Sequence, residues 1–133
     1  MRDFRELKVW QKAHELTLAV YKATACFPKV ELYGLTAQMR RASVSISANI
    51  SEGAGKNSRP EFARFLQISL GSASEVEYEL LLARDLGYLD RVGHNHLTQQ
   101  TVEVKRMLTR FIQYLNNSQT GDRGSKGFLR ADG

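Results

Sequence analysis

The sequence is poor in residues that cross-link or interrupt a chain, with one cysteine and two prolines among 133 residues. The single cysteine, Cys26, excludes an intrachain disulfide and a thiolate metal site, and a lone cysteine in a helical pattern is typical of a small core residue. No uncharged run approaches the roughly 18 apolar residues of a membrane-spanning helix. Charged side chains occupy four of the first six positions, where a secretory signal has an apolar stretch. We therefore expect a protein of the cytosol with no membrane partner.

The composition that remains is that of an ordinary globular domain, 42% hydrophobic and 25% charged. Apolar residues recur at helical spacing in four stretches, residues 6–27, 35–54, 59–86 and a last one that begins between 90 and 96 and ends near 117. These stretches cover roughly three quarters of the chain, which predicts the all-α class. Because the connections are short, we predict an up-down-up-down antiparallel four-helix bundle over residues 1–117. Residues 118–133 are polar and rich in glycine, and we expect a flexible tail there.

Residues with strong conformational preferences lie between the predicted helices. Pro28 ends the first helix, because proline has no amide hydrogen and its ring clashes with the preceding turn. Ser58 and Glu61 form a capping-box pattern, in which the hydroxyl accepts the amide of Glu61 and the carboxylate accepts the amide of Ser58. Gly87 is placed for a left-handed cap at the end of the third helix. The segment 53–55 supplies the backbone freedom that ends the second.

The third helix carries more apolar surface than one bundle core can cover. Leu80, Leu81 and Leu82 are consecutive, so they span about 200° of the helix, whereas a core-facing stripe is only somewhat wider than 100°. At least one of them is predicted to be exposed on a single chain, unless a loop or the tail covers it, and exposed apolar patches indicate an interface. The residues that we predict to form a subunit interface are Tyr78, Leu81, Leu82 and Val102.

Acidic residues concentrate in the same segment, where five Asp and Glu stand against two Lys and Arg between residues 60 and 87. A basic helix of a neighbouring subunit is a suitable partner for this segment. Repeated head-to-tail contacts of that kind close into rings. The acidic residues expected to take part are Glu75, Glu77, Glu79 and Asp85.

The whole chain is moderately basic, with 19 Lys and Arg, 14 Asp and Glu and a sequence pI of about 9.6. This surplus favours a polyanionic partner only weakly, because solvated basic faces look the same in sequence. Affinity for nucleic acid arises when Lys and Arg displace counterions from phosphates. The side chains that we predict to contact nucleic acid are Arg40, Lys56, Arg59, Arg64, Lys105, Arg106 and Arg110.

Polar residues of the second helix suggest an internal network. Arg40 and Arg41 are adjacent, so they lie about 100° apart around the helix and do not easily share a role. One can face solvent and phosphate while the other pairs with a carboxylate inside the bundle or between subunits. Because buried polar groups require partners, we predict a structural polar network of Arg41, Asn49, Glu52 and Glu75.

Patterns typical of catalysis or metal binding are incomplete in this sequence. His14 begins a pattern like that of a zinc-protease helix, but Leu18 stands where the second histidine is required. No histidine has a glutamate three positions before it, which excludes the di-iron pattern of four-helix bundles. The segment 53–58 resembles a phosphate loop but lacks its first glycine and the Ser or Thr after the lysine. His94 and His96 point to different helix faces, and we therefore predict no enzyme activity, no metal and no cofactor.

Several short motifs occur in order between about residues 4 and 90. They are Leu7-Lys8-Val9-Trp10-Gln11, Phe27-Pro28, Tyr33-Gly34-Leu35, Gln38-Met39-Arg40-Arg41-Ala42, Ser45-Ile46, Asn49-Ile50-Ser51-Glu52-Gly53, Glu61-Phe62 with Phe65-Leu66, and Gly71-Ser72 with Glu75. In these motifs the chain resembles the 23S ribosomal RNA intervening-sequence protein family, which is similar to the accessory proteins of diversity-generating retroelements. The resemblance implies a basic four-helix bundle that assembles as a ring, expected to be a homopentamer, with nucleic acid as its partner and no enzymatic activity. Ser51 and Ala54 stand where relatives more often have alanine and an aromatic residue, which affects packing rather than chemistry.

Two functions from different classes follow from these observations. The first is a cytosolic, ring-forming bundle whose basic surface binds structured RNA or other nucleic acid without reading bases. The second is a homo-oligomeric scaffold for an unidentified protein partner, in which the charge keeps the assembly soluble. Salt dependence separates the two, because phosphate contacts weaken steeply as the salt concentration rises.

Overall fold

The computed structural model describes residues 3–117, and the predicted tail at 118–133 lies outside the described residues. In chain order the elements are the 3-10 turn η1 (Phe4–Glu6), α1 (Lys8–Thr24), the 3-10 turn η2 (Lys29–Glu31), α2 (Leu35–Ala54), α3 (Arg59–Asp85) and α4 (Arg91–Asn117). No β-strand occurs within residues 3–117, and the predicted all-α class is confirmed. The second helix has the predicted bounds, and the fourth begins within the predicted interval.

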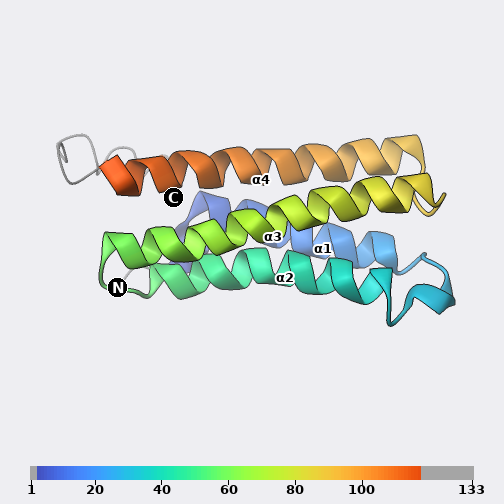
Figure 1. Cartoon of the computed structure of the whole chain (residues 1–133), viewed down its shortest axis with the longest axis horizontal. Coiled ribbons are helices and arrows are strands. Elements are labelled where there is room, and N and C mark those ends of the chain that lie inside the picture. Colours follow the sequence, from blue (N-terminus) through green and yellow to red (C-terminus); the bar gives the residue numbers. More distant parts are fainter. Residues whose placement is uncertain (1–2, 118–133) are drawn as a thin grey trace.

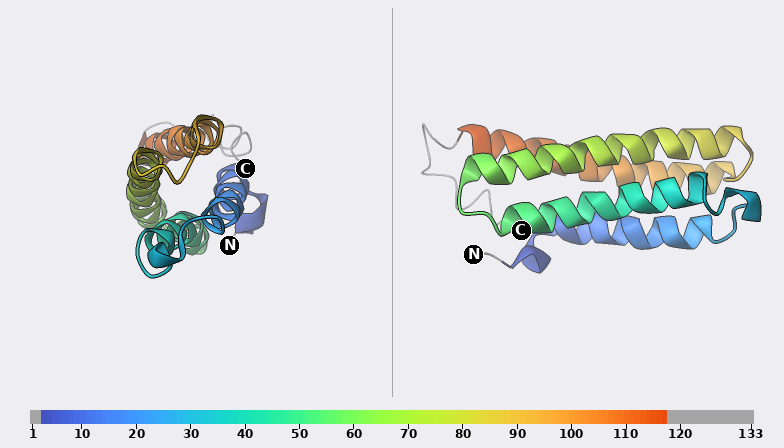
Figure 2. Two further views of the ribbon diagram at one scale, coloured as in Figure 1. Left: turned by 90° about the vertical axis from the view of Figure 1, so that its right-hand side faces the viewer. Right: turned by 60° about the horizontal axis from the view of Figure 1, so that its bottom comes forward.

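The four helices lie side by side as a bundle of rods, joined by connections at alternate ends (Figure 1). Each helix packs on two others, α1 on α2 and α4, and α3 on α2 and α4. Seen end-on, the helices enclose a common core, with α1 and α3 on opposite sides (Figure 2). Every helix therefore has one face toward the core and one face outward.

The core is built from aliphatic side chains and an aromatic contact between α3 and α4. The rings of Phe62 and Phe111 meet edge to face, with centroids 5.1 Å apart. Such a pair contributes about 0.5 to 1.5 kcal/mol beyond the area that it buries. Besides Ala63 and Glu79, the buried residues of α3 form one line, which we define as its inner face, namely Phe62, Leu66, Ser69, Ala73, Val76, Leu80 and Ala83.

The first helix ends at Thr24 rather than at Phe27, and this changes the position of Cys26. The chain tightens after the helix, because the Cys26 amide bonds to the carbonyl of Ala23 at 3.3 Å and the Phe27 amide bonds to that of Thr24 at 3.0 Å. The tighter turn buries Phe27 and leaves Cys26 exposed. The prediction that Cys26 is a core residue was therefore wrong, since it assumed that the helical period continued to Phe27.

Both predicted caps of α3 are present, with one difference. The Ser58 hydroxyl accepts the Glu61 amide at 3.2 Å, but the Glu61 carboxylate accepts hydrogen bonds from Arg64 instead of completing the capping box. At the other end Gly87 has φ +81°, and the Tyr88 amide beyond it bonds back into the last turn of the helix at 2.8 Å. Glycine suits this position because other residues rarely adopt the left-handed conformation.

Gly53 allows α2 and α3 to approach closely near their connection. A Cβ at this position would lie 2.9 Å from Cδ1 of Phe62 and 2.9 Å from Cβ of Phe65. Nonbonded carbons prefer separations of about 3.5 to 4.0 Å, so a larger residue would force the helices apart. The helix ends one residue later, at Ala54, inside the predicted segment.

At the opposite end of the bundle, Glu31 ties two connections together. Its carboxylate accepts the Leu35 amide at 3.0 Å and the Tyr88 hydroxyl, from the α3–α4 turn, at 2.9 Å. These hydrogen bonds, the one from Leu35 foremost, lower the pKa of Glu31 below its ordinary value. Beside this tie, Val30 and Tyr33 are 84% and 93% exposed. We refer to this part of the molecule as the η2 end.

Candidate functional site

Three of the predicted nucleic-acid contacts lie along α4 and the start of α3. Arg106 and Arg110 are one helical turn apart on α4, and both are exposed. One turn further along α4, the Tyr114 ring lies under the guanidinium of Arg59, which is 5.5 Å from its centroid. Arg106 and Arg110 form no ion pair with any residue between 3 and 117. We call Arg59, Arg106 and Arg110 the α4 strip.

Lys105 lies beside the α4 strip, but its charge is paired within the chain. Its Nζ donates to Oε1 of Glu77 across the α3–α4 seam at 2.7 Å. Because both side chains are half-buried, this contact is less screened by solvent than an exposed ion pair. The shallow groove at this seam is lined by Glu77, Val102, Lys105, Arg106, Thr109 and Arg110.

Lys56 and Arg64 are exposed near the α2–α3 connection, at the end of the bundle that also holds Arg59. Their charged groups lie 5.3 Å and 4.6 Å from the centroid of the Phe65 ring. Lys56 is also 3.8 Å from a carboxylate oxygen of Glu52, and Arg64 is 3.3 Å from one of Glu61. Exposed ion pairs of this kind contribute only about 0 to 1 kcal/mol, so a phosphate can compete for both cations.

Arg40 lies apart from the other predicted nucleic-acid contacts. It is half-buried near the start of α2, where its Nε donates to Oγ1 of Thr24 at 2.9 Å and its Nη2 donates to the Tyr21 carbonyl at 3.3 Å. Its guanidinium also lies 4.7 Å from the centroid of the Tyr21 ring. These contacts hold the last turn of α1 against α2, and the structure does not bring Arg40 to the α4 strip.

Of the predicted polar network, Arg41 and Glu75 lie near Glu79 at the α2–α3 seam, whereas Asn49 and Glu52 make separate contacts. Asn49 donates to the Ser45 carbonyl at 2.8 Å, and the Ser45 hydroxyl bonds to that of Ser72 on α3 at 2.8 Å. This hydroxyl and amide cluster spans the α2–α3 seam. Glu52 is exposed and contacts Lys56, so it does not join Asn49.

Glu79 lies at the α2–α3 seam, and its expected place on a subunit interface is incorrect. Only 4% of it is exposed, and its Oε1 has no hydrogen-bond partner among residues 3–117. Burial raises its pKa to about 7, the Glu75 charge adds to that effect, and the Arg41 charge opposes it. The expectation that Glu79 faces a neighbouring subunit was wrong, because the residue turns into the bundle. The sequence did contain a signal for this burial. Glu79 stands three residues after Val76 and four before Ala83, so it lies on the same helix face as these two core residues.

The predicted interface residues differ in exposure. Leu80 is fully buried, whereas Leu81 is 39% exposed and Tyr78 is 61% exposed, so the prediction of an outward leucine is confirmed. Leu82 is half-buried and packs against the core, and Val102 is half-buried at the rim of the α3–α4 groove. Among these positions Tyr78 and Leu81 supply most of the outward apolar surface.

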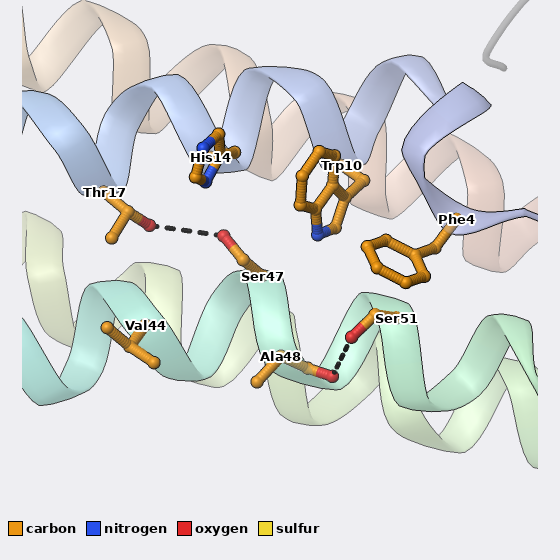
Figure 3. A pocket seen from close by; sticks show the side chains of 8 residues that line it. All are labelled: Phe4, Trp10, His14, Thr17, Val44, Ser47, Ala48 and Ser51. Atoms are coloured by element: carbon orange, nitrogen blue, oxygen red, sulfur yellow. Dashed lines mark hydrogen bonds between the residues drawn. The ribbon is translucent and has the colours of Figure 1, made fainter.

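A second apolar surface, which the sequence analysis did not find, lies between α1 and α2 (Figure 3). The rings of Trp10 and His14 stack with centroids 4.9 Å apart, and Phe4 of η1 meets Trp10 edge to face at 5.0 Å. Trp10 is half-buried and His14 is exposed. We define the α1–α2 groove by its lining residues, Phe4, Trp10, His14, Thr17, Val44, Ser47, Ala48 and Ser51.

Residues 3–117 contain neither a cluster of metal ligands nor a membrane-spanning helix. No group of three or more His, Cys, Asp or Glu side chains in this range is arranged to hold a metal ion. None of the helices in this range has both the length and the apolar character needed to cross a membrane.

The fold and these surfaces define a small helical-bundle protein with a cationic strip and two outward apolar faces. The chain belongs to the 23S rRNA-intervening sequence protein family, whose sequence profile matches residues 5–110. The resemblance drawn from the short motifs is therefore confirmed.

One similar solved structure is the crystal structure of a protein with unknown function from the S23 ribosomal protein family of Bacteroides thetaiotaomicron VPI-5482. The two chains share 28% identity and superpose with a TM-score of 0.71. The match covers 78% of this chain and 97% of the other. A comparison with curated proteins gave no match.

Proposed function

We propose that this protein is a non-enzymatic, cytosolic oligomer that binds structured RNA or other nucleic acid through the α4 strip. Each subunit is an up-down-up-down antiparallel bundle, and the assembly is a ring, expected to be a pentamer. The observation that carries the proposal is that Arg106 and Arg110 lie one turn apart, exposed, and without an ion pair among residues 3–117. The family's name, which refers to 23S rRNA, supports RNA as the partner.

The chemistry of the strip suits phosphates rather than bases. A guanidinium binds phosphate oxygens through two parallel hydrogen bonds, and neutralising phosphates releases condensed counterions. Arg59 extends the line of charge toward Lys56 and Arg64, whose own pairs with glutamate are exposed and weak. A ring presents one such strip per subunit, so several weak contacts act on one RNA at a high effective concentration.

The test is a salt titration of binding to a structured RNA hairpin and to a DNA duplex, from about 50 to 300 mM salt. We expect affinity to fall steeply with salt for both probes. The double variant Arg106→Gln/Arg110→Gln should reduce the log–log slope on the duplex by about two, since each contact contributes about 0.9.

The matched control is Arg84→Gln, an exposed arginine of α3 that is paired with Asp85 at 3.0 Å. This control should leave the slope unchanged. A slope that is the same in the double variant would move the site away from α4. Absence of RNA binding at every salt concentration would reject the proposal.

A scaffold for a protein partner is the alternative function, and the η2 end favours it. Val30 and Tyr33 are almost fully exposed there, and Val92 at the start of α4 is 77% exposed. Large exposed apolar side chains mark protein interfaces more often than nucleic-acid interfaces. This function predicts no RNA binding at any salt concentration.

A further inference from the structure

Helix α3 has small or apolar residues on two faces. Besides the inner face, the residues Gly71, Ser74, Tyr78 and Leu81 follow one another at spacings of three and four, and all four are exposed. This is the spacing of a seam between two packed helices. Of the four helices, α3 has the apolar residues that are least confined to one side. We call these four residues the outer face of α3.

Gly71 is the residue of the outer face that no contact within residues 3–117 explains. It lies near the middle of a 27-residue helix, where glycine is one of the least favourable residues. A Cβ at Gly71 would meet no atom of the described part of the chain within 4 Å, in contrast to the 2.9 Å contacts that a Cβ at Gly53 would make. Since no contact among residues 3–117 requires glycine at this position, we infer that the missing side chain serves a close approach by a molecule outside the chain.

The α1–α2 groove has the complementary features. Its wall is aromatic, formed by the stacked Trp10 and His14 rings, and its floor on α2 is made of small residues such as Ser47 and Ala48 (Figure 3). None of its lining residues is Asp, Glu, Lys or Arg. A projecting ring such as that of Tyr78 fits above the small floor.

We propose that the outer face of α3 in one copy packs into the α1–α2 groove of the next copy. Tyr78 and Leu81 lie over Ala48, while Gly71 and Ser74 leave room for the Trp10 wall. This inference rests on the ring assembly within the proposed function and identifies its two contact surfaces. The occupant is a second copy because one chain carries both surfaces on different helices. None of the residues that define the two surfaces is Asp, Glu, Lys or Arg, and the exposed Glu75 and Asp85 flank the outer face.

The geometry of the bundle determines the kind of assembly. Since α1 and α3 lie on opposite sides of the core (Figure 2), one subunit cannot bring its own outer face to its own groove. Both surfaces are then covered only by a head-to-tail contact between copies. Such contacts close into a ring when the rotation from one subunit to the next permits it.

The test uses two full-length variants, each of which blocks one surface. Ala48→Arg places a long charged side chain in the groove, and Gly71→Arg places one on the outer face. Both positions are exposed, so each variant should fold, and circular dichroism with thermal unfolding verifies this. Gln113→Arg, at an exposed position of α4 outside both surfaces, is the control.

Sedimentation at micromolar concentration gives the result. We expect an oligomer for the wild type and for Gln113→Arg, a monomer for each blocked variant, and a dimer for their equimolar mixture. The dimer forms because the intact outer face of the Ala48→Arg chain enters the intact groove of the Gly71→Arg chain.

Three other outcomes overturn the inference and are distinguishable. If the wild type is an oligomer and either blocked variant keeps its mass, the contact surfaces are wrong but the proposed ring stands. If the wild type is a monomer, both the ring and this contact are rejected. A mixture that remains monomeric rejects the head-to-tail pairing.

Discussion

The inner and outer faces of α3 use similar residues for different purposes. On the inner face, the small residue Ser69 has a neighbour that explains it, because its hydroxyl donates to the carbonyl of Ile46 at 2.8 Å. On the outer face, Gly71 has open space where its side chain would be. A small residue that has no neighbour among residues 3–117 therefore marks the part of the surface where a partner is expected.

The largest expected effect is the difference in the free energy of unfolding between alanine substitutions at two adjacent leucines, Leu80 and Leu81. Leu80→Ala removes a fully buried side chain of the inner face and should lower the free energy of unfolding by about 2 to 5 kcal/mol. Leu81→Ala should lower that of the monomer by less than about 0.5 kcal/mol, because Leu81 is partly exposed. Urea denaturation measures both, and equal losses would show that the two faces do not differ.

The next effect concerns Glu79, the charged residue buried at the α2–α3 seam. Its pKa is raised to about 7, so the folded chain keeps a proton that the unfolded chain loses near pH 4.5. Stability should therefore fall as the pH rises from about 4.5 to 7, and Glu79→Gln should be more stable than the wild type by about 2 kcal/mol at pH 8.

Urea denaturation at pH 5 and pH 8 checks this prediction, because the advantage of Glu79→Gln should largely disappear at pH 5. Glu75→Gln is the matched control. It removes the second cause of the raised pKa and should weaken the pH dependence without abolishing it, since burial is the larger cause. A wild type whose stability is constant across this range contradicts the assignment.

A smaller effect is expected at Gly53, where α2 and α3 meet. Gly53→Ala should lower the free energy of unfolding by about 1 to 2 kcal/mol, because its Cβ overlaps Phe62 and Phe65 and the helices must separate. Thermal unfolding provides the measurement. A neutral or stabilising substitution would show that the two helices can move apart at little cost.

The positions of the helices along the chain were largely predictable from the sequence, because they depend on local signals. The bounds of α2, the Ser58 cap and the left-handed Gly87 follow from residue types within one or two turns. The end of α1 was not predictable in this way. Phe27 is buried across a tight turn, and no local preference showed that the period would break before Cys26.

The candidate sites were less predictable, because they depend on which side chains of distant elements meet. Arg40 could not be separated from Arg106 and Arg110 in the sequence, yet its contacts with Thr24 hold it to α1. The α1–α2 groove depends on the position of Phe4 against Trp10, which only the fold determines. Tyr78 and Leu81 were found because three consecutive leucines exceed the width of one face.

The most direct test of an external partner for the outer face of α3 is Gly71→Ala, measured in two ways. In the monomeric Ala48→Arg background it should raise the free energy of unfolding by up to about 1 kcal/mol, since alanine is a better helix former than glycine and its Cβ meets no neighbour. In the otherwise wild-type chain it should shift dissociation of the oligomer to higher protein concentration in sedimentation. Unchanged self-association together with the gain in stability would contradict the account.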